Sequence, residues 1–509
     1  MAIVYCPINE NQYGWQSSIN NNDMEKEPSF LHDNDMDDTR PRLYLWAAGG
    51  TGMRVVSSLV MLCASGLFND IEIIPVLFDI DDNCPSLHYA VNQLELYYNI
   101  YKEAEDHNSS RLFFGSYIRP IMIRRNNTPV LSLNNSFQFD VQWKDNSSQK
   151  TKVDEQPCWD LRPGALELME SLYGKQYVKM DDFAQKSGKS KSSSEIRLQL
   201  GDLENKEDFR NMLDMIDPVR DKIIIVGSAF GTTGTAFVYE LVQLLKKSSS
   251  INQTPKALVL MQPFFQVVGS NHAEDLNYEI MKKRAQESMR FFNDCNLYKN
   301  LNYTYYIGAG IGFQVGRRTE GGEMQRNPNS IHELMGALAI VGFCKRTEYG
   351  NEPVFLHYKI PKSSAKNINI ADLAMIPNGS SAMSFLTRFA LAMKYVRNSE
   401  ESKVPAKVKE FCSMFCLWIS EMEKVSHNSF ISFDLERPEL HTIIKGRKFA
   451  EDNFIYSMTH PGKSKPLFTI DDFIIGMTSV NKSSKENKLD FFLRQLEAGS
   501  DALMEYITI

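Results

Sequence analysis

One stretch of the sequence, residues 221–247, constrains the fold more than any other. It contains four consecutive β-branched apolar residues at positions 223–226, and such a run between a charge and a glycine is typical of a buried parallel strand. Glycines and threonines follow as far as Thr235, and from Ala236 apolar residues recur at the spacing of one helical face. The stretch therefore predicts a strand, a glycine-rich turn and a helix, as in α/β proteins.

The turn within this stretch has the composition of a phosphate-binding turn. Glycine lets the backbone approach an anion closely, and a helix start offers unpaired N–H groups at the positive end of its dipole. Threonine hydroxyls add further donors. An ordinary tight turn is the alternative, and a Walker A loop is excluded because Gly-Lys-Ser/Thr is absent. The predicted phosphate-binding residues are Gly231, Thr232, Thr233, Gly234 and Thr235.

A second glycine-rich turn lies near the beginning of the chain. The pattern predicts a strand at 42–48, a helix at 53–64 and a second strand at 71–78 that ends on acidic residues. This order is that of a mononucleotide-binding half of an α/β sheet. Glycines that serve only close packing are the alternative. The predicted nucleotide-binding residues are Gly49, Gly50, Thr51, Gly52, Asp79 and Asp81.

Bulk properties narrow the class of protein. With 509 residues, of which 43% are hydrophobic, the chain has room for two or three globular domains. The net charge of −7 argues against general nucleic-acid binding. No apolar run reaches membrane-spanning length, the first residues do not resemble a signal peptide, and the eight cysteines form no CxxC pair. We therefore expect a cytoplasmic protein with no nucleic-acid partner, no membrane partner and no metal site.

Residues 230–236 resemble the tubulin/FtsZ signature G-G-G-T-G-[ST]-G, with Phe230, Thr232 and Ala236 in place of three of its glycines. Other pieces follow in the family's order: the first glycine turn, the acidic end of the second strand, a Pro-Gly loop at 160–169 and a strand ending in Pro-Phe at 263–264. Residues 325–328, Gln-Arg-Asn-Pro before an apolar helix, resemble a prokaryotic tubulin-like subgroup.

The resemblance implies an α/β fold with a tubulin/FtsZ-like parallel-sheet nucleotide-binding domain at 41–345. A polar N-terminal arm at 1–40 precedes it, and a smaller α/β domain at 346–509 with a C-terminal helix follows it. Insertions are expected at about 102–155 and 186–194, and the first of these is expected to hold a hairpin built from 112–114 and 137–143. Independently of the family, Ser330 and Glu333 predict a capping box at a helix start.

The resemblance also implies GTP as the ligand, with Mg²⁺ as a candidate ion. Arg162 and Gly164 would face the terminal phosphate, and Asn327 and Asn329 would read the base unless they are ordinary turn residues. The implied function is head-to-tail self-assembly with weak or assembly-dependent GTPase activity. Asp372 would act in hydrolysis across the contact between two copies, and another protein of the same system is a further candidate partner.

Two alternatives remain open at this stage. In the first, the protein is a degenerate nucleotide-binding scaffold or sensor without hydrolysis, for example in phage defence. The expected acidic loop, Asn-x-Asp-x-x-Asp, has no acid at its middle position here, where Asn369 stands, which favours this alternative. In the second, the protein is a Rossmann-type dinucleotide enzyme, although Gly-x-Gly-x-x-Gly is absent from the first turn. The cellular process is not contained in the sequence.

Overall fold

The structure is a computed structural model. The residues that it describes are 40–67, 71–79, 84–104, 112–125, 128–131, 137–139, 203, 206–267, 278–308, 313–315, 327–350, 352–358, 373–424, 470–482 and 486–504.

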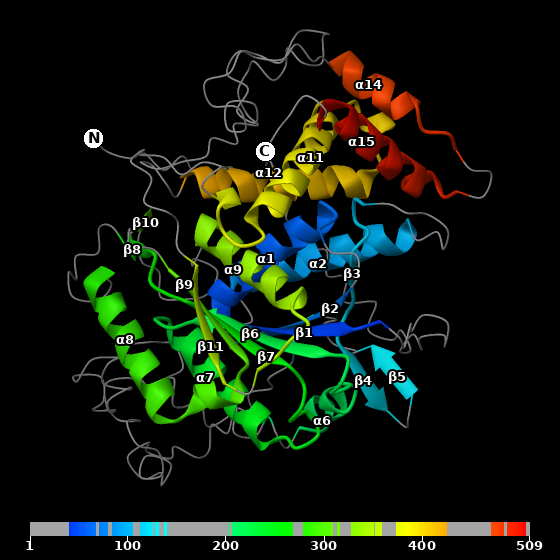
Figure 1. Ribbon diagram of the computed structural model, residues 1–509. Helices are drawn as coiled ribbons and strands as arrows, with labels where there is room; N and C mark the ends of the chain where they lie inside the picture. Colours follow the sequence, from blue (N-terminus) through cyan, green and yellow to red (C-terminus); the bar gives the residue numbers. More distant parts are fainter. Residues whose placement is uncertain are drawn as a thin grey trace, which may run out of the picture.

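A seven-stranded parallel sheet forms the centre of the protein, with the order β11-β9-β7-β6-β1-β2-β3 (Figure 1). Its strands are β1 (Arg42–Ala48), β2 (Glu72–Phe78), β3 (Tyr117–Ile118), β6 (Lys222–Ser228), β7 (Lys256–Met261), β9 (Tyr303–Ile307) and β11 (Val354–Tyr358). The order runs from β1 to β3 in one direction and from β6 to β11 in the other. It therefore reverses between β1 and β6, as in doubly wound α/β proteins, and the expected α/β fold is confirmed.

Ten α-helices surround this sheet within the described residues. They are α1 (Gly49–Ala64), α2 (Pro85–Glu103), α6 (Glu207–Leu213), α7 (Thr232–Lys247), α8 (Tyr278–Asp294), α9 (Ile331–Cys344), α11 (Gly379–Asn398), α12 (Ala406–Lys424), α14 (Ile470–Thr478) and α15 (Lys488–Met504). Figure 1 shows α1, α2 and α9 on one face and α7 on the other. Helices α11, α12, α14 and α15 form an outer layer beyond α1 and α2.

Smaller elements complete the described structure. Strands β4 (Met122–Arg125) and β5 (Thr128–Leu131) form an antiparallel pair, and β8 (Phe265–Val267) and β10 (Phe313–Val315) form a parallel pair. Short 3₁₀ helices occupy Leu297–Asn300 and Glu401–Lys403.

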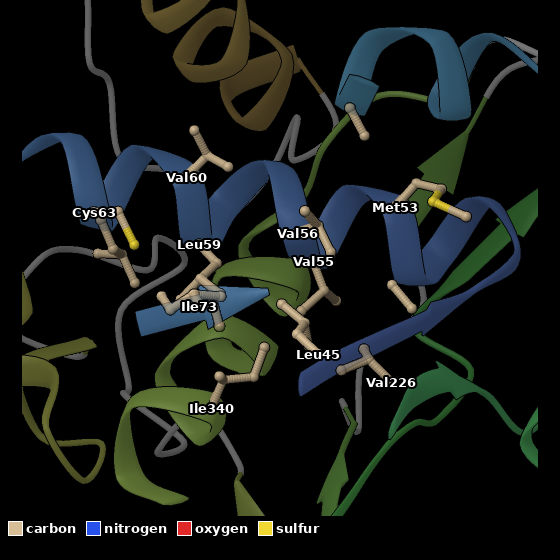
Figure 2. Packing of buried hydrophobic residues seen from close by; sticks show 14 of the residues in the cluster. Leu45, Met53, Val55, Val56, Leu59, Val60, Cys63, Ile73, Val226 and Ile340 are labelled. Atoms are coloured by element: carbon tan, nitrogen blue, oxygen red, sulfur yellow. The ribbon is translucent and has the colours of Figure 1, made fainter. Parts of the chain in front are cut away.

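Helix α1 lies at the centre of the hydrophobic core. Fourteen of its sixteen residues are buried, because the sheet lies on one side of it and α2, α9 and α11 contact its other sides. Figure 2 shows Val55 and Leu59 of α1 among Leu45, Ile73 and Ile340, which come from β1, β2 and α9. A helix that is apolar all round its surface is stable only when it is covered in this way.

The strands predicted at 42–48 and 223–226 are confirmed as β1 and β6. Helix α1 begins at Gly49, four residues before the predicted start at Met53, because the glycine run forms its first turn. The described parts of the expected hairpin differ from the prediction. Residues 112–114 form a turn, and Gln138 forms a parallel bridge with Leu77 of the main sheet.

The predicted boundary at residue 345 stays a prediction. Strand β11, which follows that boundary, pairs with β9 and extends the main sheet, and the elements in the described ranges 373–424, 470–482 and 486–504 are all helical. None of the helices in the described part of the chain is both long and apolar enough to cross a membrane.

A buried ion pair fixes the amino ends of β1 and β6. The backbone N–H and Nε of Arg42 donate to Asp221 Oδ1 at 3.1 and 3.2 Å, and Nη2 lies 3.1 Å from Oδ2. The Asp221 side chain is fully buried and also accepts from the backbone of Asp217 at 2.8 Å. These contacts join segments that are 179 residues apart in the sequence.

We predict that Asp221→Ala lowers the free energy of unfolding by about 3–5 kcal/mol, because it leaves the Arg42 charge buried without its partner. Urea unfolding measures the change. Asp217→Ala is the matched control, since its ion pair with Arg220 is roughly one-third exposed and such surface pairs contribute about 1 kcal/mol or less. Equal losses in the two variants would contradict the prediction.

A second prediction concerns Lys394 of α11, which is 6% exposed. Burial lowers its pKa to about 7, whereas lysine in an unfolded chain has a pKa of about 10.4. Between these values the unfolded state binds more protons, so stability rises with pH. We expect the free energy of unfolding to rise from about pH 7 to pH 9 by up to roughly 1.4 kcal/mol per pH unit.

Denaturation at several pH values tests this expectation, with Lys394→Met as the variant that lacks the rise. Lys403→Met, a change at a lysine whose side chain is 65% exposed, should keep the wild-type dependence on pH. A rise that persists in Lys394→Met would show that another group causes it.

Candidate functional site

The candidate site lies at the edge of the sheet where β1 and β6 end. The two strands pair in parallel, with Leu43 opposite Lys222 and Ala47 opposite Val226, so both strands finish at the same edge. Helix α1 starts directly after β1, and α7 starts four residues after β6. Ligands of doubly wound sheets bind outside the carboxyl ends of the strands where the strand order reverses. That reversal falls between β1 and β6.

The two glycine turns contact each other at this point. Gly49 has a φ of +68°, and a Cβ there would lie 3.0 Å from the backbone nitrogen of Gly234. A Cβ at Gly234 would lie 2.8 Å from Ser228 Oγ and 3.4 Å from the carbonyl oxygen of Ala48. The backbones of the two helix starts can approach this closely only because both residues are glycine.

Both helix starts lack a capping side chain. The residues at the N-cap positions of α1 and α7 are Ala48 and Gly231, and neither makes a side-chain hydrogen bond there. Neither helix has an acidic residue in its first turn. The first N–H groups of a helix have no partner within the helix, and the dipole makes this end positive. Two positive helix ends therefore lie side by side at one edge of the sheet.

Hydrogen bonds within the second turn fix its shape. Ser228 Oγ accepts from the backbone N–H of Gly231 at 3.3 Å, and the Thr235 hydroxyl donates to the carbonyl oxygen of Ser228 at 2.9 Å. The Thr235 hydroxyl is thus engaged within the protein and is 1% exposed as a residue. Thr235, predicted to bind phosphate directly, has in this structure the role of closing the turn.

The predicted acidic position lies beside these turns. Asp79 directly follows β2, which neighbours β1 in the sheet, and it is buried. Burial and the negative charge of Asp79 raise the pKa of the Cys84 thiol to about 11, so Cys84 remains a neutral thiol at physiological pH.

A buried arginine adjoins the first glycine turn, and the sequence analysis did not single it out. Arg54 Nε donates to Glu333 Oε1 at 2.7 Å, Nη1 donates to Ser86 Oγ at 3.2 Å, and Nη2 donates to Thr51 Oγ1 at 3.3 Å. Its signal in the sequence is a single charge within the otherwise uncharged helix 49–64. The capping box predicted for α9 is confirmed, with Glu333 bound to Ser330.

The two asparagines expected to read the base lie before α9. Asn329 is buried, and its backbone N–H and Nδ2 both donate to Glu421 Oε2 of α12, at 3.1 and 2.6 Å. Burial raises the pKa of Glu421. Asn329 thus connects the start of α9 to the outer helix layer, while Asn327 is partly exposed.

The structure brings most of the predicted residues together. The two turns place the following at one edge: Gly49, Gly50, Thr51, Gly52, Gly231, Thr233 and Gly234. Thr232 is the first residue of α7. Four predicted residues lie outside the described residues: Asp81, Arg162, Gly164 and Asp372. Within the ranges that the structure describes, no group of three or more His, Cys, Asp or Glu residues could hold a metal ion.

Comparisons with known proteins assign no family to the chain. No family model matches it, and no curated protein matches it. Among solved structures, the comparison gives the glycosyltransferase UGT2 of Phytolacca americana, complexed with UDP-2fluoro-glucose and pterostilbene. That chain is 10% identical, the match covers 95% of this chain and 94% of that one, and the TM-score is 0.21. A likeness of this size carries neither a fold nor a ligand over to the protein.

The tubulin/FtsZ resemblance is therefore wrong as an identification. No family model and no curated protein matches the chain, and the solved structure that the comparison gives is a glycosyltransferase rather than a tubulin or FtsZ. The function drawn from the resemblance falls with it: a tubulin-like protein that assembles head-to-tail into filaments, with GTPase activity across a contact between copies. GTP as the ligand, Mg²⁺ as the ion, and self-association or a second protein as partner stay predictions. The matching glycines and threonines belong to a turn between strand and helix, which many α/β proteins share.

The two adjacent glycines of the first turn, Gly49 and Gly50, should respond differently to substitution by alanine. Gly49→Ala should lower the free energy of unfolding by about 1–3 kcal/mol, because the residue must keep a left-handed conformation against the backbone of Gly234. Gly50→Ala is the matched control, since the nearest atom, Arg54 Nη1, would lie 3.5 Å from its Cβ. Denaturant unfolding should find Gly50→Ala unchanged or more stable, and the reverse ranking would contradict the described turn.

Proposed function

We propose that the protein binds a nucleotide through its phosphate groups at the two glycine turns after β1 and β6. One observation carries the proposal: two uncapped, glycine-lined helix starts touch where the strand order reverses. Helix starts of this kind bind phosphate because N–H groups and the dipole both favour a negative charge. Because Gly49 and Gly234 are in contact, a single phosphate chain would reach both helix starts in this proposal.

The neighbouring strand supports a nucleotide rather than a free phosphate. Asp79 follows β2, and an acidic residue at the end of the second strand binds the ribose hydroxyls in dinucleotide-binding α/β proteins. In this proposal the phosphates lie at the turns after β1 and β6, and the ribose lies toward β2. The remaining predicted binding residues, Arg162 and Gly164 among them, stay predictions.

A Rossmann-type dinucleotide enzyme is the second candidate function. The strand order favours it, because β3-β2-β1 on one side and β6-β7-β9 on the other repeat the arrangement of two nucleotide-binding halves. A scaffold or sensor that binds nucleotide without converting it shares the same site. The enzyme would convert its bound ligand, whereas the scaffold or sensor would not. Analysis of the nucleotide after incubation with the protein would distinguish these two functions.

Calorimetric titration with NAD, NADP, ATP, GTP, UDP and inorganic pyrophosphate, each with and without Mg²⁺, tests the proposal. We expect at least one nucleotide to bind with a Kd on the order of 1–100 μM, which corresponds to roughly −5 to −8 kcal/mol. Binding of NAD or NADP in preference to the mononucleotides would favour the dinucleotide enzyme. The absence of binding by all nucleotides at about 1 mM would reject the proposal.

A substitution at Thr233 separates binding from stability. Thr233 lies in the first turn of α7 and is partly exposed. Thr233→Asp should leave the protein as stable or stabilise it by about 0.3–1 kcal/mol, because a negative charge favours a helix start. The same charge should repel a ligand phosphate and raise the Kd about tenfold or more, a loss of about 1.4 kcal/mol.

Thr233→Asn is the matched control, because asparagine has nearly the same shape as aspartate but carries no charge. We expect it to change the Kd far less than Thr233→Asp does. If the two variants bind the nucleotide equally well, the phosphate does not lie at the start of α7.

A further inference from the structure

Arg54 is a charged side chain in α1, a helix in which fourteen of the sixteen residues are buried. It is 5% exposed, and its three hydrogen bonds reach Thr51, Ser86 and Glu333. Each of these partners lies in the first turn of a helix. Thr51 is the third residue of α1, Ser86 the second residue of α2, and Glu333 the third residue of α9. One guanidinium therefore joins the first turns of three helices.

Arg54 forms a buried ion pair with Glu333. Glu333 accepts from Arg54 through Oε1, while its Oε2 accepts from the backbone and the hydroxyl of Ser330 at 2.6 Å each. The charge of Arg54 also acts on the carboxyl of Glu421, whose pKa it lowers against the larger effect of burial. Arg54 is thus held in place by the buried carboxylate of Glu333, and its rigid fork of donors fixes the positions of its partners.

The bond to Thr51 has a chemical consequence. A hydroxyl group has one proton to donate and two acceptor lone pairs. Because Thr51 Oγ1 accepts from Arg54 Nη2 at 3.3 Å, its own proton must point away from the guanidinium. Thr51 is partly exposed and lies in the glycine turn, so this proton is available to an anion at the helix start.

We propose that Arg54 is a positioning residue of the phosphate site, acting through Thr51. It orients the Thr51 hydroxyl as a donor to the ligand phosphate and holds the first turn of α1 against α2 and α9, without touching the ligand itself. This inference rests on the proposed function, since it concerns the same glycine turn. According to this inference, the affinity for phosphate depends on the Arg54 side chain, although Arg54 does not contact the ligand.

A double-mutant cycle tests the inference, with the tightest-binding nucleotide and inorganic pyrophosphate as probes. We expect Arg54→Met to raise the Kd about tenfold and Thr51→Val about threefold to tenfold. The double variant should bind no more weakly than Arg54→Met within about twofold, because residues that act through one another are not additive. Additive effects, or an unchanged Kd in Arg54→Met, would overturn the inference.

Arg42→Met is the matched control for lost stability. Arg42 is similarly buried and pairs with the buried carboxylate of Asp221, but it lies at the amino end of β1, the opposite edge of the sheet. We expect it to lower the thermal midpoint as Arg54→Met does while the Kd stays within about twofold of the wild type. A tenfold rise in Kd for Arg42→Met as well would mean that lost stability alone weakens binding, and would overturn the inference.

A second pair of variants keeps the inference testable if Arg54→Met fails to fold. Thr51→Ser keeps the hydroxyl and should keep the wild-type Kd, whereas Thr51→Val should not. Equal binding by these two variants would overturn the inference while nucleotide binding by the wild type still stood. A wild-type protein that binds neither nucleotide nor pyrophosphate would instead reject the proposed function itself.

Discussion

The parallel pairing of β1 with β6 is the constraint on which the rest of the structure depends. At the amino ends of these strands, the buried ion pair of Arg42 and Asp221 fixes the register. At the carboxyl ends, the same register places Gly49 against Gly234. The strands come from distant parts of the chain, so neither turn alone forms the candidate site. A shift of the register would separate the two helix starts and remove the shared edge where a phosphate chain could lie.

The sequence predicted those features that depend on neighbouring residues. The apolar run at 223–226, the strand at 42–48 and the capping box at Ser330 each carry a local signal, and each is confirmed. Contacts between distant segments carry no such signal. Two of the three partners of Arg54 come from α2 and α9, and Gln138 pairs with Leu77 of the main sheet rather than forming a hairpin. The family identification failed for a related reason, because a short glycine and threonine motif describes a turn and not the whole chain.

The site is connected to the outer helix layer through polar contacts that cross the apolar core. Asn329 donates to Glu421 of α12, and the indole N–H of Trp418, also in α12, donates to Ser58 of α1 at 3.1 Å. Buried polar groups need such partners because an unpaired one costs about 1–3 kcal/mol. These bonds therefore fix how α12 lies on α1 more strictly than apolar packing alone would. The middle of α1, at Ser58, and the segment before α9, at Asn329, are therefore both joined to α12.

The carboxylate of Glu497 has a consequence for the order in which the chain acquires its structure. Glu497 lies in helix α15, near the end of the sequence. Its Oε1 accepts hydrogen bonds from the backbone N–H groups of Leu112 and Phe113 at 2.8 and 2.7 Å. The acceptor is made 384 residues after Phe113, which takes roughly 20–80 s at a ribosomal rate of about 5–20 residues per second. During that interval the turn that follows α2 has no native acceptor for these two groups. The backbone N–H groups of Leu112 and Phe113 can therefore reach their native acceptor only after α15 has been synthesised.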